Sequence, residues 1–467
     1  MKFRGLLLIF LLAAVTLMSQ TPLEPEVGEG TEDNPYQIGS LGNLYWIAAS
    51  DEEVSEPVQS IRWASHYIQT ADIDASETVN WFNGKGWSPI GNCWEEPFSG
   101  RYDGQWHLID GLFINRPEEE NIALFGYTIG TVAITNLVLT DIDVTGYEAV
   151  GSLVGICMDR LDIINSYASG IISGAARVGG LVGDLRASNL SNCSSNVLVN
   201  GEDNAGGLVG SMAKSIVTSS CSIGELNGGT RTGGLVGSIN QSGVIDCFSR
   251  VLVRGSHSVG GLVGNLDLGS VVNSYSTGTV VANYDFGGLI GEVCSFSYEV
   301  IHSYWDVDCS GILESPAGEG RTTEEMTYPY AANTYFDWNF QEVWIEDETH
   351  SVNDGYPYLQ GIVLAVDNST IQPELVFRLR NYPNPVNPET TILYELSKSH
   401  SSLGLKIYNC RGQLVRILFE NRAHGEGDYR IVWDGKGNLG EKVSSGVYFC
   451  LLIAPETRAV HRMLVIR

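Results

Sequence analysis

Short apolar runs separated by polar, glycine-bearing corners recur through the middle of the chain. In the stretch that begins at Gly233, the runs are Leu235-Val236, Val244-Ile245 and Val251-Leu252-Val253. Apolar runs this short, bounded by turn residues, are typical of β-strands. The pattern therefore predicts three short strands in each repeat.

One corner returns at a nearly constant interval. It reads GSLVG at Gly151, GGLVG at Gly179, Gly206, Gly233 and Gly260, and GGLIG at Gly287, with starts 28, 27, 27, 27 and 27 residues apart. The segment NIALFGY at Asn121–Tyr127 is an imperfect earlier copy. A fixed period of this length indicates stacked repeats that bury their apolar faces against their neighbours.

The repeat predicts a parallel β-solenoid. Leucine-rich repeats of similar period need an L-x-x-L-x-L pattern followed by Asn or Cys, which these units lack. Because stacked strands lie about 4.8 Å apart, roughly seven coils would form a rod about 30 Å long. We expect the paired glycines at a tight corner where the backbone takes positive φ and has no room for a Cβ.

Two neighbouring columns of residues follow from the period. Small residues, expected to point inward, stand ten to twelve positions after each phrase: Ser166, Cys193, Cys221, Cys247, Ser274 and Ser303. The next column, expected to point outward by strand alternation, holds Tyr167, Ser194, Ser222, Phe248, Tyr275 and Tyr304. Exposed rings at Tyr167, Phe248, Tyr275 and Tyr304 would form a candidate binding column for a glycan or a surface protein, and packed aromatic stacking is the alternative.

Five segments of different character divide the chain. Lys2 and Arg4 precede an apolar run, which predicts a secretory signal peptide over residues 1–20. An acidic leader and N-terminal cap are expected over 21–60, with a short amphipathic helix near Leu41, and the solenoid over 61–310. An aromatic-rich cap and linker are expected over 311–366, and six strand-like runs predict a small β-sandwich over 367–467.

Charge separates the last segment from the rest. The formal net charge of the chain is −28, which disfavours nucleic acid as a partner. From Asn368 onward there are nine carboxylates and thirteen Lys or Arg residues, so the acidic body and the mildly basic tail are different modules. No stretch after the predicted signal is apolar enough to cross a membrane as a helix.

Two family resemblances follow from these motifs. The GGLVG units resemble the GLUG repeat of bacterial surface and adhesin-like proteins, and NPYQI, WSPIGN, FSGRYDGQWHLIDGL, LFGY and GYPYL resemble their flanking elements. The tail, from NYPNPVNPETTILYEL to HRMLVIR, is similar to FlgD-like immunoglobulin-like domains, which overlap the sorting domains of the type IX secretion apparatus. Cys410 and Cys450 depart from that pattern. The resemblances imply export and surface display or release, with the secretion machinery as a partner.

Few residues suggest chemistry. Asp141 and Asp143 share one strand face, and paired carboxylates can cleave polysaccharides, but two solvent-facing positions of a strand are the simpler explanation and the one we favour. Gly435–Gly440 fits G-x-G-x-x-G, but strand-like sequence follows it, so a hairpin loop is expected. The phrase with Asp184 distantly resembles a calcium-binding nonapeptide whose acid most units lack. Nine cysteines leave at least one unpaired, and the pairing of the others stays open.

We therefore expect an all-β, non-enzymatic protein that is secreted or held at a bacterial surface. Catalytic residues, cofactors and metal ligands are not predicted. The solenoid would serve adhesion or a structural role, and the tail would direct export. The alternative is a carbohydrate-active protein, either a lyase or hydrolase or a glycan-binding module, that uses the flank of the solenoid.

Overall fold

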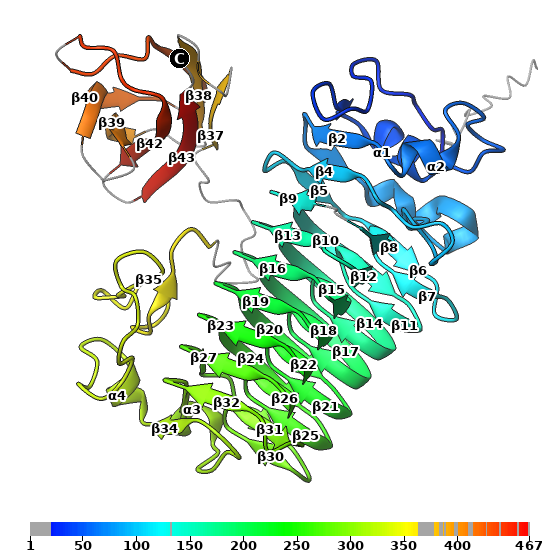
Figure 1. The fold of residues 1–467 in the computed structure, drawn as a ribbon, viewed down its shortest axis with the longest axis vertical. Coiled ribbons are helices and arrows are strands. Elements are labelled where there is room, and N and C mark those ends of the chain that lie inside the picture. The colour runs from blue at the N-terminus through cyan, green and yellow to red at the C-terminus, as the bar shows by residue number, and fades with distance from the viewer. Residues whose placement is uncertain are drawn as a thin grey trace, which may run out of the picture. The chain divides into compact units, whose positions relative to one another are not determined.

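The computed structural model describes residues 20–130, 133–362, 378–382, 386, 389–396, 400–409, 414–425, 427–438, 440–454 and 457–465. The predicted signal segment and Cys410 lie outside this part of the chain. Two compact units are present, residues 1–364 and residues 365–467. Figure 1 shows the first as a stack of coils and the second as a group of small sheets.

The first unit is a parallel β-solenoid with three strand-bearing sides, as the repeat predicted. Its first side, sheet A, holds ten parallel strands. They are β1 (Tyr36–Ile38), β2 (His66–Gln69), β4 (Arg101–Asp103), β9 (Ala133–Thr135), β13 (Asp162–Ile164), β16 (Asn189–Ser191), β19 (Ile216–Thr218), β23 (Gly243–Ile245), β27 (Ser270–Val272) and β32 (Glu299–Ile301).

Sheets B and C form the other sides. Sheet C contains β8 (Phe125–Ile129), β12 (Val154–Met158), β15 (Val182–Arg186), β18 (Val209–Ala213), β22 (Val236–Asn240), β26 (Val263–Asp267) and β31 (Ile290–Val293). Sheet B contains β3 (Ile73–Asp74), β5 (Leu108–Asp110), β6 (Phe113–Asn115), β7 (Glu120–Ile122), β10 (Val138–Thr145), β11 (Glu148–Val150), β14 (Tyr167–Gly179), β17 (Ser194–Gly206), β20 (Cys221–Asn227), β21 (Thr230–Gly233), β24 (Phe248–Arg254), β25 (His257–Gly260), β28 (Tyr275–Ser276), β29 (Val280–Val281), β30 (Phe286–Gly287), β33 (Tyr304–Asp306) and β34 (Glu319–Arg321).

The solenoid has more coils than its glycine phrases indicate. Sheet A has ten strands, about one for each coil, so the expectation of seven was too low. The extra coils come from residues 36–115, which contain β1, β2 and β4, lack the paired glycines and bury bulky side chains such as Trp87 and Phe98. Phe125 pairs with Val154, which confirms NIALFGY as an earlier copy of the phrase. Ten strands at about 4.8 Å make a stack about 45 Å long.

The glycine phrase forms the corner between sheets B and C, and of the two reasons expected for its glycines, the lack of room for a Cβ is confirmed and positive φ is wrong. None of its glycines has positive φ; that conformation falls two residues earlier, on Arg177, Asn204 and Arg231. The glycines are required by close approach between coils instead. A Cβ at Gly179 would overlap the carbonyl oxygen of Val182 and lie 2.6 Å from the amide nitrogen of Gly210. Each coil therefore needs the same side-chain-free corner.

Helices close the N-terminal end. The predicted amphipathic helix is α1 (Leu41–Ala48), whose N-cap Ser40 accepts a hydrogen bond of 3.2 Å from the amide of Asn43. Leu44, Tyr45, Trp46 and Ile47 are buried against the first coils. Helix α2 (Gln59–Arg62) and a 3₁₀ segment at Ser76–Gly84 complete this end. The helical cap covers strand edges that would otherwise be open to pairing.

The segment after the last coil forms a second cap, defined here as residues 307–362. It contains α3 (Val307–Ser310), α4 (Thr323–Met326), β35 (Trp344–Ile345) and β36 (Tyr358–Leu359). Figure 1 shows α4 and β35 beside the lower coils, against their flank rather than beneath them. Strand β34 extends sheet B by pairing with β33.

The second unit contains two small antiparallel sheets within its described residues. One has the order β37-β38-β41 and the other β40-β39-β42-β43. Their bounds are β37 (Arg378–Tyr382), β38 (Thr390–Leu396), β39 (His400–Asn409), β40 (Leu414–His424), β41 (Gly427–Trp433), β42 (Gly446–Ala454) and β43 (Thr457–Val465). Residues of both sheets, among them Ile392, Trp433, Leu405 and Leu452, share one buried cluster.

Candidate functional site

The candidate aromatic column is a true column in sheet B, with one correction to its membership. Tyr167 pairs with Ser194, Ser194 with Cys221, Cys221 with Phe248, Phe248 with Tyr275, and Tyr275 with Tyr304. Cys221 therefore belongs to this column, and Ser222 does not. The inward column of small residues has Ser220 in its place. The sequence-based assignment was wrong by one residue in this coil. Ser220, Cys221 and Ser222 are all small, so residue size did not show which of them faces inward.

The small column stabilises the corner before sheet B. The amide of Cys193 donates to the hydroxyl of Ser220 at 3.1 Å, and that of Cys247 donates to Ser274 at 3.1 Å. The amide of Ser274 donates to Ser303 at 3.2 Å. Inward hydroxyls thus accept backbone hydrogen bonds from the preceding coil, which explains why this column holds only small residues.

The aromatic column is not exposed where we expected it to be. Phe248, Tyr275 and Tyr304 are at most 1% exposed, and only Tyr167 is partly accessible. The rings lie outward from the strand, but the cap packs its own aromatic side chains on them. Phe248 stacks on Tyr275 at 5.1 Å, and Tyr275 lies 5.9 Å from Trp344 and 6.1 Å from Tyr356. The expectation of an open platform is wrong for these three residues, and packed aromatic stacking describes them.

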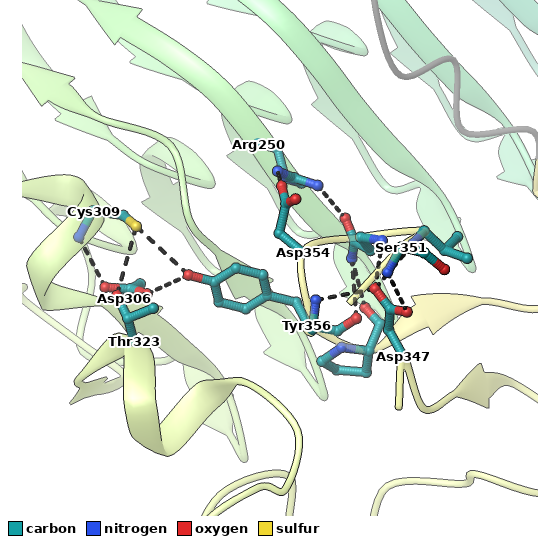
Figure 2. A network of polar contacts seen from close by, with 12 residues as sticks. Arg250, Asp306, Cys309, Thr323, Asp347, Ser351, Asp354 and Tyr356 are labelled. Carbon is teal, nitrogen blue, oxygen red and sulfur yellow. Dashed lines mark hydrogen bonds and ion pairs between the residues drawn. The ribbon is translucent and has the colours of Figure 1, made fainter. Parts of the chain in front are cut away.

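A polar network fixes one side of the cap to the solenoid. Arg250 of β24 donates to the side-chain oxygen of Asn353 at 2.6 Å and forms an ion pair with Asp354. The amide of the Asn353 side chain donates to the Tyr275 hydroxyl at 2.7 Å. Asn353 is fully buried, so these bonds satisfy groups that would otherwise be costly to bury. Figure 2 shows Arg250 reaching Asp354 from the solenoid side.

A second part of the network fixes the other side. The buried carboxylate of Asp306 accepts hydrogen bonds from the Tyr356 hydroxyl at 2.5 Å and the Thr323 hydroxyl at 2.7 Å. Its other oxygen accepts from the amides of Asp308 and Cys309. Figure 2 shows the Tyr356 phenol directed at this carboxylate. Burial and the bond to Asp306 raise the pKa of Tyr356, so its phenol stays protonated and serves as a donor.

Asp347 organises the loop that carries Asn353. Its carboxylate accepts hydrogen bonds from the backbone amides of Ser351, Val352, Asn353 and Gly355, at 2.7–3.1 Å. Burial alone would raise the pKa of Asp347, but these hydrogen bonds outweigh it and hold the pKa below its ordinary value. The ionised carboxylate therefore holds the loop in the conformation that presents Asn353 to Tyr275.

This geometry predicts loss of cap docking in acid. A carboxylate with a lowered folded-state pKa contributes stability above its unfolded pKa, about 3.9, and that stability is lost as the pH falls through the lower folded pKa. We expect protease cleavage within 307–362 to increase as the pH falls below about 4. The Asp347→Asn variant should show a weaker pH dependence, because it has no charge to lose there. Equal pH dependence of the two proteins would contradict this role.

The acid pair on the solenoid flank lies as the simpler interpretation expected. Asp141 and Asp143 are exposed on β10, whereas Ile142 and Val144 between and beside them are buried. A register shift between Leu139 and Ile142 places Asp141 at positive φ. Partial burial, and then the charge of Asp141, raise the pKa of Asp143. The two acids share a face, and one of them holds its proton more readily than an ordinary aspartate.

The other motifs are structural. Asp184 is almost fully buried and pairs with Arg177 at 3.2 Å and Arg186 at 2.6 Å, so its charge is balanced by guanidinium groups. No group of three His, Cys, Asp or Glu residues in the described part of the chain is arranged to hold a metal. Gly435 and Gly440 lie in the connection between β41 and β42, and an isolated antiparallel bridge joins Lys436 to Lys442 there. The two strands belong to different sheets, so the connection is a local turn and not the expected hairpin loop between paired strands.

The cysteines in the described residues are free thiols. They are Cys93, Cys157, Cys193, Cys221, Cys247, Cys294, Cys309 and Cys450. Burial raises the pKa of Cys193 to about 12. Cys193 and Cys247 share the small column but stand two coils apart, with Ser220 between them, and so do not meet.

Sequence reasoning did not find the residues that attach the cap. Arg250, Asn353 and Asp347 gave no motif, because their partners lie about a hundred residues away or are backbone amides. The one available signal was the density of aromatic residues in the cap itself, which indicated burial but not its location.

One repeat of the solenoid matches a known family model, and parts of the chain match two known proteins. Residues 255–281, one period of the solenoid, match the family model described as the GLUG motif. Over 165 residues, 35% of the chain, the sequence is 33% identical to Halomucin of Haloquadratum walsbyi, and the match covers 2% of that protein. Over 132 residues, 27% of the chain, it is 34% identical to a putative Gly-rich membrane protein of Evansella cellulosilytica, covering 14% of it. The chain thus spans a small part of each relative.

Two solved structures also align with short stretches. Dimeric latent PorU from Porphyromonas gingivalis aligns over 24% of this chain and 10% of its own, at 19% identity and a TM-score of 0.17. PorZ of the same organism, described as an essential bacterial surface component of the type-IX secretion system, aligns over 25% and 14%, at 21% identity and a TM-score of 0.15. Alignments at these TM-scores carry no argument about this chain.

The fold and the motif together define a class. This chain contains a parallel β-solenoid built of glycine-cornered repeats, one of which matches the GLUG motif. Within the residues that the structure describes, no helix has the length and apolar character needed to cross a membrane.

Proposed function

We propose that this chain is a non-enzymatic protein displayed at or released from a bacterial cell surface. The solenoid acts as a rigid spacer or adhesive stalk, and the second unit acts as an Ig-like sorting domain read by a type IX-like secretion apparatus. The observation that carries the proposal is the continuous ten-stranded stack, closed by helices at one end and flanked by a bonded cap at the other. Such a body presents long, regular surfaces and resists unfolding.

The names of two relatives and the sequence of the tail support the proposal that the chain is displayed at a cell surface. Two relatives that match part of the chain are named Halomucin and a putative Gly-rich membrane protein. The tail carries the ordered motif set of FlgD-like domains, and its two antiparallel sheets bury a core of their own. A unit with its own core is suited to recognition by export machinery independently of its cargo.

The sorting role is tested by deletion. We expect a chain that ends at Leu364 to accumulate in the periplasm, while the full chain reaches the surface or the medium. Protease accessibility of intact cells, with immunoblotting of cell fractions, measures the difference. The retained protein should keep the circular dichroism of a folded β-protein. Normal surface delivery of the folded, truncated chain would refute the sorting role.

One observation favours a second candidate function, cleavage or binding of a polysaccharide on the flank. The raised pKa of Asp143, beside the exposed Asp141, is a property that a general acid requires. Carboxylates in that relation support glycosidic chemistry when a substrate lies across them.

This alternative gives its own prediction. On the non-enzymatic proposal, Asp143→Ala leaves stability within about 0.5 kcal/mol, because the side chain is exposed. Asp141→Ala costs about 1 kcal/mol, because Asp141 has positive φ, which alanine adopts less readily. Both substitutions leave a reducing-sugar assay at its background with a panel of polysaccharides. Turnover by the full chain that either substitution abolishes would establish the alternative, and binding on a glycan array without turnover would support an adhesive role.

A further inference from the structure

We propose that a hollow over Gly243 on sheet A receives Phe296 of a second copy of this chain, so that two solenoids associate side by side and antiparallel about a two-fold axis. The proposal rests on a strand glycine that the backbone does not require, on the hollow that it helps to line, and on an exposed ring two coils further along the stack.

Gly243 differs from the other glycines of the repeats. The corner glycines cannot accept a Cβ, because backbone atoms of adjacent coils would overlap it. Gly243 opens β23, has no positive φ, and a Cβ there would meet only the Ser270 hydroxyl at 3.3 Å and the Ile245 methyl at 4.0 Å. Glycine inside a strand weakens it, so where the backbone does not require glycine, close approach by another molecule is a physical reason for it.

A shallow, open hollow of about 520 Å³ lies on the outer face of sheet A, and Gly243 is one of the residues that line it. The same position holds Ile216 in the coil before and Ser270 in the coil after. Ile216, Ile245 and Leu268 form apolar walls, and Lys214 and Gln241 stand at the rim. Ile216 is 44% exposed and Leu268 39%, so the hollow lies within an apolar surface that water covers in the single chain.

The chain also carries a matching projection on its last coil. Phe296 lies in the segment between β31 and β32 and is fully exposed. Gly243, Ser270 and Glu299 occupy the same position in three successive coils of sheet A. Phe296 belongs to the coil of Glu299, so it lies one coil after Ser270, and Gly243 lies one coil before Ser270. Figure 1 shows β23, β27 and β32 as successive strands of one side of the stack.

This spacing makes the surface self-complementary. A two-fold axis that runs parallel to the strands of sheet A, in front of its outer face and at the level of Ser270, turns the two faces toward each other and exchanges the level of Gly243 with that of Phe296. Each ring then meets the hollow of the other copy, which gives two identical contacts in a closed dimer. The same rotation brings Glu299 of one copy to within one coil, or about 4.8 Å, of Lys214 of the other copy. A lysine side chain can span that distance, so the two opposite charges can pair.

A head-to-tail arrangement is less suited to this chain. The N-terminal end is covered by α1 and the leader, whose Val27 accepts a hydrogen bond of 3.0 Å from Gln37 of β1. The side face carries the accessible apolar residues instead. The acidic net charge opposes self-association, but it is screened beyond about 8 Å at physiological ionic strength.

The test is the association state of the purified full chain in 0.15 M salt, measured by sedimentation velocity over a range of concentrations. We expect a reversible dimer. The Gly243→Leu variant fills the hollow and Phe296→Ser removes the projection, and each should weaken dimerisation by about tenfold or more. Leu313→Ser is the matched control, because Leu313 is 83% exposed near the last coil and takes no part in the contact.

Mixing the two variants gives a sharper result. Neither variant retains a ring and an open hollow in its own dimer. A mixed dimer keeps one complete contact. In it, the Gly243→Leu chain supplies the Phe296 ring, and the Phe296→Ser chain supplies the open hollow. We therefore expect the mixture to form more dimer than either variant alone at the same total concentration.

A chain that stays monomeric at every concentration overturns the proposal and leaves the hollow to a different protein or to a glycan. A dimer that neither variant weakens also overturns it, because the contact would then lie elsewhere. Unchanged circular dichroism and unfolding temperature in both variants will show that their effect is on association and not on folding.

Discussion

Replacing Gly206 with alanine is expected to destabilise the solenoid by about 3 kcal/mol or more, although only one methyl group is added. The new Cβ would overlap the carbonyl oxygen of Val209 and lie 2.8 Å from the amide nitrogen of Gly237. Both atoms belong to backbones held in register by the coils on either side, so neither can move without breaking hydrogen bonds between coils. Chemical denaturation of the full chain measures the loss.

Gly243→Ala is the matched control for this prediction. It adds the same methyl group one coil further along, where the added atom meets only movable side-chain ends. We expect a change of less than about 1 kcal/mol, with a gain possible because alanine restricts the unfolded chain. Equal destabilisation by the two substitutions would show that close approach between coils is not what the glycine phrase provides.

The second large effect concerns the cap. Trp344→Ala is expected to destabilise docking of residues 307–362 by about 3–5 kcal/mol, the usual result of removing a buried tryptophan. Trp344 is 1% exposed, stacks on Trp338 at 4.4 Å, and donates from its indole nitrogen to Asp246 at 3.2 Å. Limited proteolysis should then cleave the cap, and binding of an apolar dye should report the newly exposed Phe248 and Tyr275.

Trp94→Ala is the control for cap docking. Trp94 is 65% exposed and lies in the N-terminal part of the solenoid, so its loss should leave proteolysis of the cap unchanged. A cap that remains resistant in the Trp344→Ala protein would mean that the polar bonds of Arg250 and Asn353 hold it without the aromatic packing. A glycan that binds only the Trp344→Ala protein would show that the aromatic column can bind sugars once it is uncovered.

The regular parts of the fold could be predicted because each coil buries the same apolar positions and turns at the same glycine corner. The interval between glycine phrases predicted stacked parallel coils, and the short apolar runs predicted three strands in each. Alternation predicted the inward column except at Cys221, where the assignment was wrong by one residue. The spacing of Leu41, Leu44 and Tyr45 predicted α1. The number of coils was underestimated because Trp87, Phe98 and Tyr102 fill the early corners and core without the phrase.

The candidate site could be predicted only in part. Strand alternation placed Phe248, Tyr275 and Tyr304 outward correctly, but outward does not mean exposed when another segment covers the strand. That covering depends on contacts such as Tyr275 with Asn353, which are 78 residues apart and follow no repeat. The significance of Gly243 was equally hidden, since in the sequence it is one glycine among many. Gly243 differs from the corner glycines only in the structure, where the space beside its backbone could hold a side chain.

The central claim is that the solenoid is presented outside the cell. The most direct measurement is labelling of intact cells with an antibody against residues 136–306, compared with the same cells after lysis, alongside an assay of the medium. This account predicts full labelling before lysis or recovery of the chain in the medium. Labelling that appears only after lysis, with none of the chain in the medium, would contradict it.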